Sequence, residues 1–302
     1  MANDSPVIIE VAINGATSKK RNLHSPQSPE EIAEVAIACL DAGASVIHNH
    51  IEGMDIKGID AAERYAAGWR PVRARHPNAI LYPTVVYDDD AEVRFGHLPH
   101  LGEMGSADMA VLDPGSVNFA VGEENGLPGR DFVYRNSYSD IRFAFDRMDK
   151  LGLGPSLALY DPSFARAVIA WHRAGKLPRG TFVKFYFGGD YEFMTGETGG
   201  ASFGLRPTAK ALEAYLEMFE GIDLPWACAV LGGDATGCGM TRLALERGGH
   251  VRIGLEDYCG EDQPSNLDLL RDAVGLCREV GRPIATQEQA RSILGLRSPA
   301  MA

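Results

Sequence analysis

The sequence has few cysteines and no pattern that would pair them. Its 302 residues include five cysteines, and no two of them form a CxxC motif. An odd number without such a motif argues against a disulfide framework and agrees with a reducing compartment. We therefore expect a cytoplasmic protein in which most cysteines are small core residues.

Long apolar runs, basic clusters and nucleotide-binding signatures are also missing. No run approaches the roughly 18 apolar residues of a membrane span. The formal net charge is -12 at pH 7, and no lysine- or arginine-rich block stands out. No GxGxxG follows the first apolar run, and no GxxxxGK[ST] occurs. We expect neither a membrane protein nor nucleic acid as the main partner.

Eight short apolar runs recur along the chain, and amphipathic segments separate most of them. The runs are residues 7–13, 44–50, 79–85, 109–113, 156–160, 182–187, 226–231 and 251–255. Nearly continuous apolar strands that alternate with helices are typical of a parallel sheet covered by helices. The pattern predicts an α/β fold, a single (β/α)8 TIM-barrel domain over residues 1–302 with a C-terminal helix.

The helices and loops between these runs can be placed in outline. Ser28 with Glu31, and Thr286 with Gln289, form capping boxes that begin the first and the last helix. Further helical segments are residues 59–75, 139–151, 163–174, 207–219 and 266–280. Two connections, 113–136 and 188–204, are longer than a barrel needs. Because both follow predicted strands, we expect them at the face where barrels place active sites.

The second apolar run ends in a pair of histidines. His48 and His50 are two positions apart, so a strand would point both imidazoles to one face. A single histidine in a core is more often a hydrogen-bonded packing residue. Two at the end of an apolar strand are a rarer pattern, and imidazole is the commonest transition-metal ligand at neutral pH. The pair predicts two metal ligands.

An acidic doublet follows the eighth apolar run. In residues 249–257, Arg252 and Glu256 share one face by alternation, and Asp257 follows. Only the first strand of a barrel separates the second strand from the eighth, so Glu256 can join the histidines. Two histidines and a carboxylate suit catalytic zinc or non-haem iron. The alternatives are a solvated acidic strand end and, for Arg252, a structural ion pair.

Four segments resemble a known family. They are residues 42–50 (AGASVIHNH), 114–119 (PGSVNF), 248–257 (GGHVRIGLED) and 284–296 (IATQEQARSILGL). On these motifs, and over nearly the whole chain, the sequence resembles the β-keto acid cleavage enzymes. The resemblance implies a zinc-dependent (β/α)8 barrel that assembles as a homotetramer. It also implies an acyltransferase that condenses a β-keto acid with acetyl-CoA to give acetoacetate and a new acyl-CoA.

The resemblance also assigns residues to roles. The family's metal ligands match His48, His50 and Glu256. Its acid–base aspartate matches Asp257, and its active-site arginine matches Arg252. The implied chemistry is Lewis-acid catalysis by Zn²⁺, proton transfer by Asp257, and orientation of Asp257 or an oxyanion by Arg252.

Three positions depart from the family member that cleaves 3-keto-5-aminohexanoate. Thr17, Pro83 and Val111 stand where that enzyme has a glutamate, a serine and a threonine. Those polar groups contact substrate or tune the arginine and the aspartate. We therefore expect a β-keto acid other than 3-keto-5-aminohexanoate.

Four residues are candidate substrate contacts. Thr84, Ser116 and Asn118 are possible polar liners of the pocket. Glu52 stands where relatives with an HxHxR pattern have arginine. If Glu52 faces inward, it would favour a cationic substrate group, together with Asp190 and Glu192 on the glycine-rich loop. The alternatives are a solvated loop charge for Glu52 and a structural strand residue for Thr84.

Two other classes of function stay open from the sequence. A metal-dependent aldolase or hydrolase on the same barrel would need no CoA. A binding protein would keep the metal only for structure. Assays with and without acetyl-CoA separate these classes from the acyltransferase.

Overall fold

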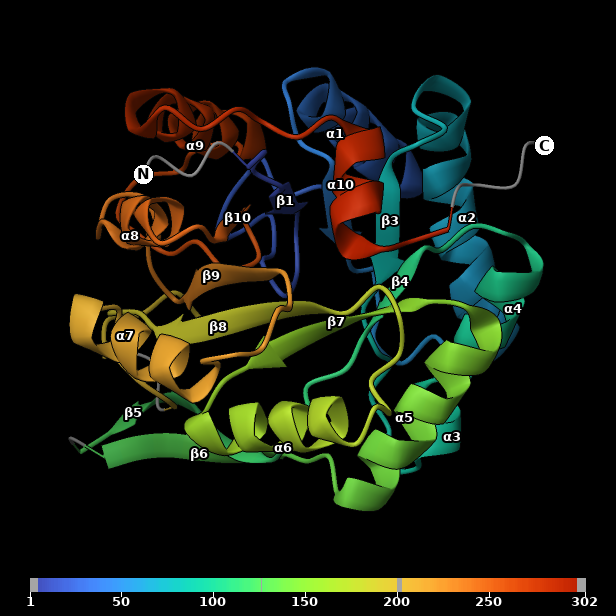
Figure 1. Ribbon diagram of the computed structural model, residues 1–302, viewed down its shortest axis with the longest axis horizontal. Coiled ribbons are helices and arrows are strands. Elements are labelled where there is room, and N and C mark those ends of the chain that lie inside the picture. Colours follow the sequence, from blue (N-terminus) through green and yellow to red (C-terminus); the bar gives the residue numbers. More distant parts are fainter. Residues whose placement is uncertain (1–4, 126, 200–202, 298–302) are drawn as a thin grey trace.

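Eight parallel strands form the centre of the molecule, and helices surround them (Figure 1). The computed structural model describes residues 5–125, 127–199 and 203–297. The barrel strands are β1 (Ile9–Ala12), β2 (Val46–Asn49), β3 (Ile80–Pro83), β4 (Met109–Val111), β7 (Gly154–Leu159), β8 (Phe182–Gly188), β9 (Trp226–Leu231) and β10 (His250–Ile253).

The strands follow the order of a barrel. Backbone ladders join them as β3-β2-β1-β10-β9-β8-β7-β4. In this register Ala12 pairs with His48 and Glu10 pairs with Arg252. Between β3 and β4 the Asp108 N–H donates to the Leu81 carbonyl at 2.9 Å, so the sheet is nearly closed. The predicted (β/α)8 barrel is confirmed.

The longer helices lie close to the predicted segments. They are α1 (Pro29–Asp41), α2 (Gly58–Arg75), α5 (Tyr138–Leu151), α6 (Pro162–Arg173), α7 (Ala209–Met218), α9 (Asn266–Val280) and α10 (Gln287–Leu294). Both capping boxes are present, at Ser28 with Glu31 and at Thr286 with Gln289. In the described part of the chain, no helix is long and apolar enough to cross a membrane.

Three shorter helices were not predicted. They are α3 (Ala91–Arg94), α4 (Leu98–Glu103) and α8 (Met240–Glu246), with lengths of four, six and seven residues. Such lengths complete two helical turns at most, which is too few to establish an apolar period.

The N-terminal opening of the barrel is filled by apolar side chains. Ile8, Val46 and Phe182 form one buried cluster with Ala290 and Leu294 of α10. The C-terminal helix therefore covers this end. The opposite, C-terminal mouth is left to the candidate site, as in other barrels of this type.

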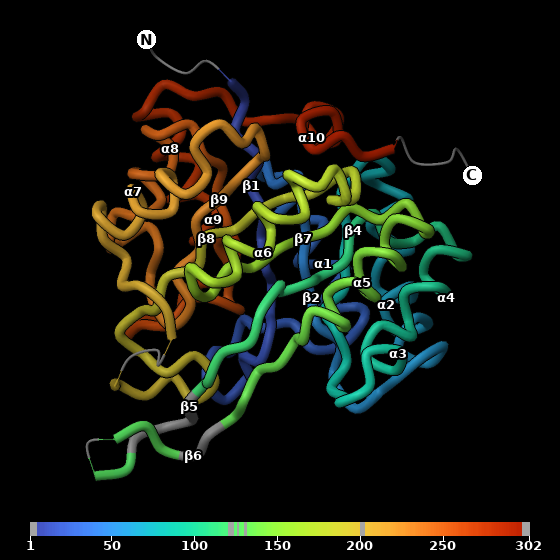
Figure 2. Tube along the Cα trace, turned by 60° about the horizontal axis from the view of Figure 1, so that its bottom comes forward, coloured from blue at the N-terminus to red at the C-terminus, as the bar shows by residue number. Residues whose placement is uncertain are grey.

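The long connection after β4 contains a hairpin that the sequence did not predict. β5 (Val117–Glu124) and β6 (Leu127–Tyr134) pair in an antiparallel ladder. Figure 2 shows the hairpin extending from the body of the barrel. The expectation of a loop over 113–136 was therefore wrong. The ladder places Phe119 opposite Phe132, and this aromatic pair faces the barrel mouth.

Candidate metal centre and active site

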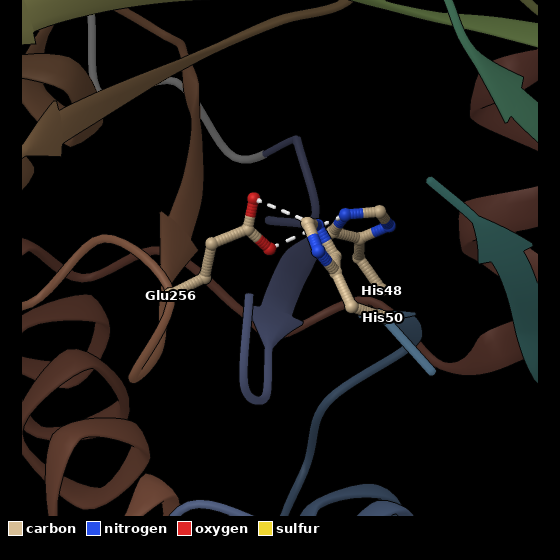
Figure 3. A group of neighbouring side chains, drawn as sticks. All are labelled: His48, His50 and Glu256. Atoms are coloured by element: carbon tan, nitrogen blue, oxygen red, sulfur yellow. Dashed lines mark ion pairs between the residues drawn. The ribbon is translucent and has the colours of Figure 1, made fainter. Parts of the chain in front are cut away.

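His48, His50 and Glu256 come together at the mouth of the barrel. His48 Nε2 lies 3.2 Å from Glu256 Oε2, and His50 Nε2 lies 3.6 Å from Glu256 Oε1. One ligand atom from each residue lies within 4.8 Å of the others. Figure 3 shows the carboxylate facing both imidazoles. Residues from distant parts of the chain thus form one possible metal site.

The surroundings of these three side chains fit a metal ion. Glu256 Oε2 is buried without a hydrogen-bond donor, an arrangement that is costly unless a cation compensates it. Burial lowers the pKa of His48 to about 3, so its imidazole is neutral. His48 Nδ1 lies 3.2 Å from the Tyr82 carbonyl, which only accepts. Nδ1 therefore carries the proton, and Nε2 is left for a metal.

A side chain from the segment after β1 fixes the position of His50. The sequence predicted His50 within the strand, but β2 ends at Asn49. Instead, Asn14 Oδ1 accepts the His50 N–H at 2.8 Å, and Asn14 Nδ2 donates to the His50 carbonyl at 3.0 Å. These two bonds hold the backbone of His50 in place of the ladder.

A turn, and not strand alternation, directs Glu256 to the histidines. β10 ends at Ile253, so the expectation of a strand through 257 was wrong. Gly254 has φ +137, and a Cβ there would lie 2.1 Å from the Ala12 carbonyl. The N–H groups of Asp257 and Tyr258 both donate to the Gly254 carbonyl. Only glycine allows the chain to turn so close to β1.

Arg252 connects three carboxylates beneath the metal site. Its Nε and Nη2 donate to the two oxygens of Asp257 at 2.8 and 3.2 Å. Nη2 also lies 3.2 Å from Glu256, while Nη1 donates to Glu10. Burial raises the pKa of Asp257 to about 6, against the lowering effect of Arg252. The guanidinium therefore fixes the orientation of Asp257 relative to the metal ligands.

A buried polar network adjoins Arg252, and the sequence analysis missed it. Lys184 Nζ donates to both oxygens of Glu10 at 3.1 and 3.2 Å and to the Tyr82 hydroxyl at 2.8 Å. It also donates to Ser156. Burial would raise the pKa of Glu10, but Lys184 and Arg252 lower it to about 2. Burial lowers the pKa of Lys184 to about 8.

A cavity of about 490 Å³ extends from the metal site toward the barrel mouth. Its inner end is lined by His48, His50, Tyr82, Ser156, Lys184, Arg252 and Glu256. Its outer end is lined mainly by Val85, Phe119, Phe132, Tyr134, Ala158, Tyr160, Phe193 and Leu231, together with the charged residues Asp88, Asp89, Arg94, Asp113 and Arg135. Charged side chains line the inner end, and apolar side chains predominate at the outer end.

The candidate substrate contacts lie in different places. Thr84 lines the cavity. Ser116 is not among the described residues that line the cavity. Its hydroxyl donates to the Asn136 carbonyl. Asn118 lies on β5 opposite Val133 and is not a lining residue either.

The acidic residues expected to attract a cation point elsewhere. Glu52 forms an ion pair with Arg64 at 2.8 Å and is absent from the described lining. Asp190 pairs with Arg206. Glu192 accepts the N–H groups of its own turn, at residues 194 and 195. The structure does not bring these three carboxylates to the metal site.

The three departures from the 3-keto-5-aminohexanoate enzyme have different surroundings. The Thr17 hydroxyl donates to the Leu255 carbonyl at 2.6 Å, which ties the segment after β1 to the turn that carries Glu256. Pro83 ends β3 opposite Asn49. Val111 lines the cavity and makes its wall apolar.

The barrel and its site define a class of protein, a (β/α)8-barrel enzyme with a histidine–carboxylate site at the C-terminal mouth. Comparison with known families is more specific. Residues 6–296 match the family model of the β-keto acid cleavage enzyme. The chain belongs to the β-keto acid cleavage enzyme family.

Similar proteins align with this chain over nearly their full lengths. The chain is 30% identical over 300 residues to the 3-oxoadipate:acetyl-CoA acetyltransferase of Cupriavidus necator, covering 97% of this chain and 96% of that protein. It is 29% identical to the 3-keto-5-aminohexanoate cleavage enzyme of Acetoanaerobium sticklandii, covering 96% and 98%. A solved complex of ObcA with C4-CoA adduct and oxalate shares the fold, with TM-score 0.66, 18% identity, and coverage of 90% of this chain and 67% of that chain.

Proposed function

We propose that this enzyme is a zinc-dependent acyltransferase that acts on a β-keto acid and acetyl-CoA. The products are acetoacetate and a new acyl-CoA. The observation that carries the proposal is the convergence of His48, His50 and Glu256 at the inner end of a cavity that Arg252 also lines, with Asp257 hydrogen-bonded to Arg252. Membership of the family and the names of its acetyl-CoA-dependent relatives support it.

The proposed reaction exchanges acyl groups in two steps. Asp257 accepts a proton from C2 of the keto acid, and C2 forms a bond to the acetyl carbonyl carbon as CoA thiolate leaves. The thiolate then attacks the original C3 carbonyl carbon, and the C2–C3 bond breaks. Acetoacetate departs with that electron pair and regains a proton at C2 from Asp257. Nothing is oxidised or reduced.

Each group of this chain has a separate task in the proposal. His48, His50 and Glu256 would hold the ion, which supplies Lewis-acid stabilisation of negative charge on the keto acid. Arg252 orients Asp257 through two hydrogen bonds. The two-histidine, one-carboxylate donor set would suit zinc or non-haem iron, and the family resemblance favours zinc.

Incubation with acetyl-CoA and a panel of β-keto acids tests the activity. We expect acetoacetate to appear in step with the new acyl-CoA, and only when acetyl-CoA is present. Turnover without CoA would instead support an aldolase or hydrolase. Stoichiometric metal without any turnover would support a binding protein. Elemental analysis of the purified protein checks zinc against iron and manganese.

The assembly stays a prediction from the family resemblance, and the location stays a prediction from the cysteine content. We propose a homotetramer in the cytoplasm. Sedimentation velocity distinguishes the tetramer from smaller assemblies, and cell fractionation tests the location.

A further inference from the structure

An aromatic wall forms one side of the outer cavity. We define it as Phe119, Phe132, Tyr134, Tyr160 and Phe193, all of which line the cavity. The ring centroid of Phe119 lies 5.2 Å from that of Tyr160 and 5.3 Å from that of Phe193. Rings at these distances are in mutual contact, so they form a packed surface.

Aliphatic side chains complete the outer cavity. Ala158 of β7 and Leu231 of β9 line it near the ends of their strands, and Val111 of β4 lines the cavity deeper in the barrel, where it pairs with Ser156. Ala158 and Leu231 belong to the same buried cluster as Phe119, and Val117 packs against it. A substrate bound at the metal would therefore extend its side chain into apolar surroundings.

The carboxylate nearest to the aromatic wall already has partners. Asp113 Oδ2 accepts the Tyr134 hydroxyl at 2.5 Å, and Oδ1 accepts the Ala158 N–H at 3.2 Å. These bonds direct the carboxylate to the hairpin and to β7. Lys184 and Arg252 attract this carboxylate electrostatically, but their ion pairs are with Glu10 and Asp257.

The other charged groups of the outer cavity also have partners. Asp88 pairs with Lys57 at 2.6 Å, and Asp89 pairs with Arg135 at 3.3 Å. Arg94 lies 3.7 Å from Asp140 in an ion pair, and its Nη1 donates to the side chain of Asn136 at 2.9 Å and to the carbonyl of residue 135 at 2.7 Å, while Nε and Nη2 make no hydrogen bond to a described residue. A charged substituent on the substrate would therefore have to compete for a counter-ion that is already engaged.

We infer that the substrate is a 3-oxo acid with an uncharged, apolar side chain, branched alkyl or aryl, held against the aromatic wall. This inference rests on the proposed acyltransferase function. A charged group buried here without a counter-ion would lose hydration and gain little in return. Apolar surface, by contrast, gains free energy in proportion to the area that the wall removes from water.

A pair of isosteric substrates tests the charge. One is a 3-oxo acid that ends in a tert-butyl group, and the other ends in a trimethylammonium group of the same shape. A third substrate is 3-oxoadipate, which ends in a carboxylate. We expect kcat/KM for the tert-butyl acid to exceed both others by about tenfold or more, equivalent to about 1.4 kcal/mol.

The outcomes separate this inference from the proposed function. Preference for the trimethylammonium compound would mean that Asp113 and the rings bind a cation, and preference for 3-oxoadipate would mean an anion site. Either result overturns the apolar side chain while leaving the acyltransferase intact. If neither these three compounds nor other 3-oxo acids yield acetoacetate, the proposed function itself is overturned.

A variant of the aromatic wall tests its part in selectivity. Phe119→Ala should lower kcat/KM for the tert-butyl acid by about tenfold. For 3-oxopentanoate, which is too short to reach the wall, the decrease should stay below about threefold. The matched control is Phe143→Ala on α5, which removes a phenylalanine outside the cavity lining. Equal losses for both substrates would contradict the assignment of the wall, and if Phe119→Ala fails to fold, the isosteric pair decides alone.

Discussion

The inner and outer ends of the cavity differ in the elements that supply their side chains. At the inner end, barrel strands carry Glu10, His48, Lys184 and Arg252. At the outer end, the β5–β6 hairpin and the β8 loop carry most of the aromatic wall. Strands in a closed sheet hold their side chains in a fixed register. Insertions change more freely without disturbing the barrel.

The two ends also differ in how their charges are compensated. At the inner end Arg252 forms ion pairs with Glu10, Glu256 and Asp257, and Lys184 forms an ion pair with Glu10. Such a network is stable only when every member is satisfied. At the outer end Asp88 and Asp89 form separate ion pairs, and the buried Asp113 accepts hydrogen bonds from Tyr134 and the Ala158 N–H. In our proposals the inner end carries out the reaction and the outer end selects the side chain of the substrate.

Removal of a metal ligand should have the largest effect. His48→Ala and Glu256→Gln should each abolish stoichiometric metal binding and lower kcat by more than about 100-fold, because changes outside the ligand shell alone cost up to that much. Elemental analysis and steady-state kinetics measure both. His24→Ala, at an exposed position, is the control. A variant that keeps both metal and activity would contradict the assignment.

Disruption of the inner network should have the next largest effect. Glu10→Gln leaves Lys184 and Arg252 buried with one carboxylate fewer, which should cost about 3–5 kcal/mol of unfolding free energy. Because Glu10 also orients Arg252, kcat should fall by about 10-fold or more with little change in KM. Chemical denaturation and kinetics check the two effects, and metal content should be unchanged.

A second substitution distinguishes positioning from general instability. Glu10→Gln combined with Lys184→Met should recover part of the lost stability, since the unpaired cation is removed. If Glu10 positions Arg252, the low kcat should persist in the double variant. Glu213→Gln breaks an exposed pair with Arg247 and should cost no more than about 1 kcal/mol. Full recovery of kcat together with stability would assign Glu10 a structural role only.

The inner end was largely predictable because its signals are local. The histidines at the end of the second apolar run indicated His48 and His50. The acidic doublet after the eighth apolar run indicated Glu256 and Asp257. Glu10 and Lys184 were missed because their partnership spans 174 positions in sequence. A signal existed, since each is a charged residue within an otherwise apolar run. Such a residue requires a buried partner.

The outer end was poorly predictable because its geometry depends on tertiary contacts. The hairpin sequence has charged and glycine residues near its turn. Such a composition is typical of a loop. The direction of Glu52 depends on Arg64 of α2, a helix that the local sequence does not place relative to the loop. The expected cation site therefore failed on orientation, while the three proposed metal ligands did come together, His48 on β2 and His50 and Glu256 just after the ends of β2 and β10.

Asp113→Asn should have the smallest effect. It tests the carboxylate that links Tyr134 of the hairpin to the Ala158 N–H of β7. Burial raises the pKa of Asp113 from 3.8 to about 6. The folded state therefore favours the protonated form, and this stabilisation is present in full below pH 3.8 and is lost as the pH rises through about 6. The unfolding free energy of the native protein, relative to the variant, should fall over that window by at most about 3 kcal/mol.

Denaturation at several pH values measures this difference between native protein and variant, with exposed Asp146→Asn as a control that keeps the native pH dependence. Parallel curves for Asp113→Asn and the native protein would mean that Tyr134 and the Ala158 N–H stabilise the carboxylate enough to offset its burial.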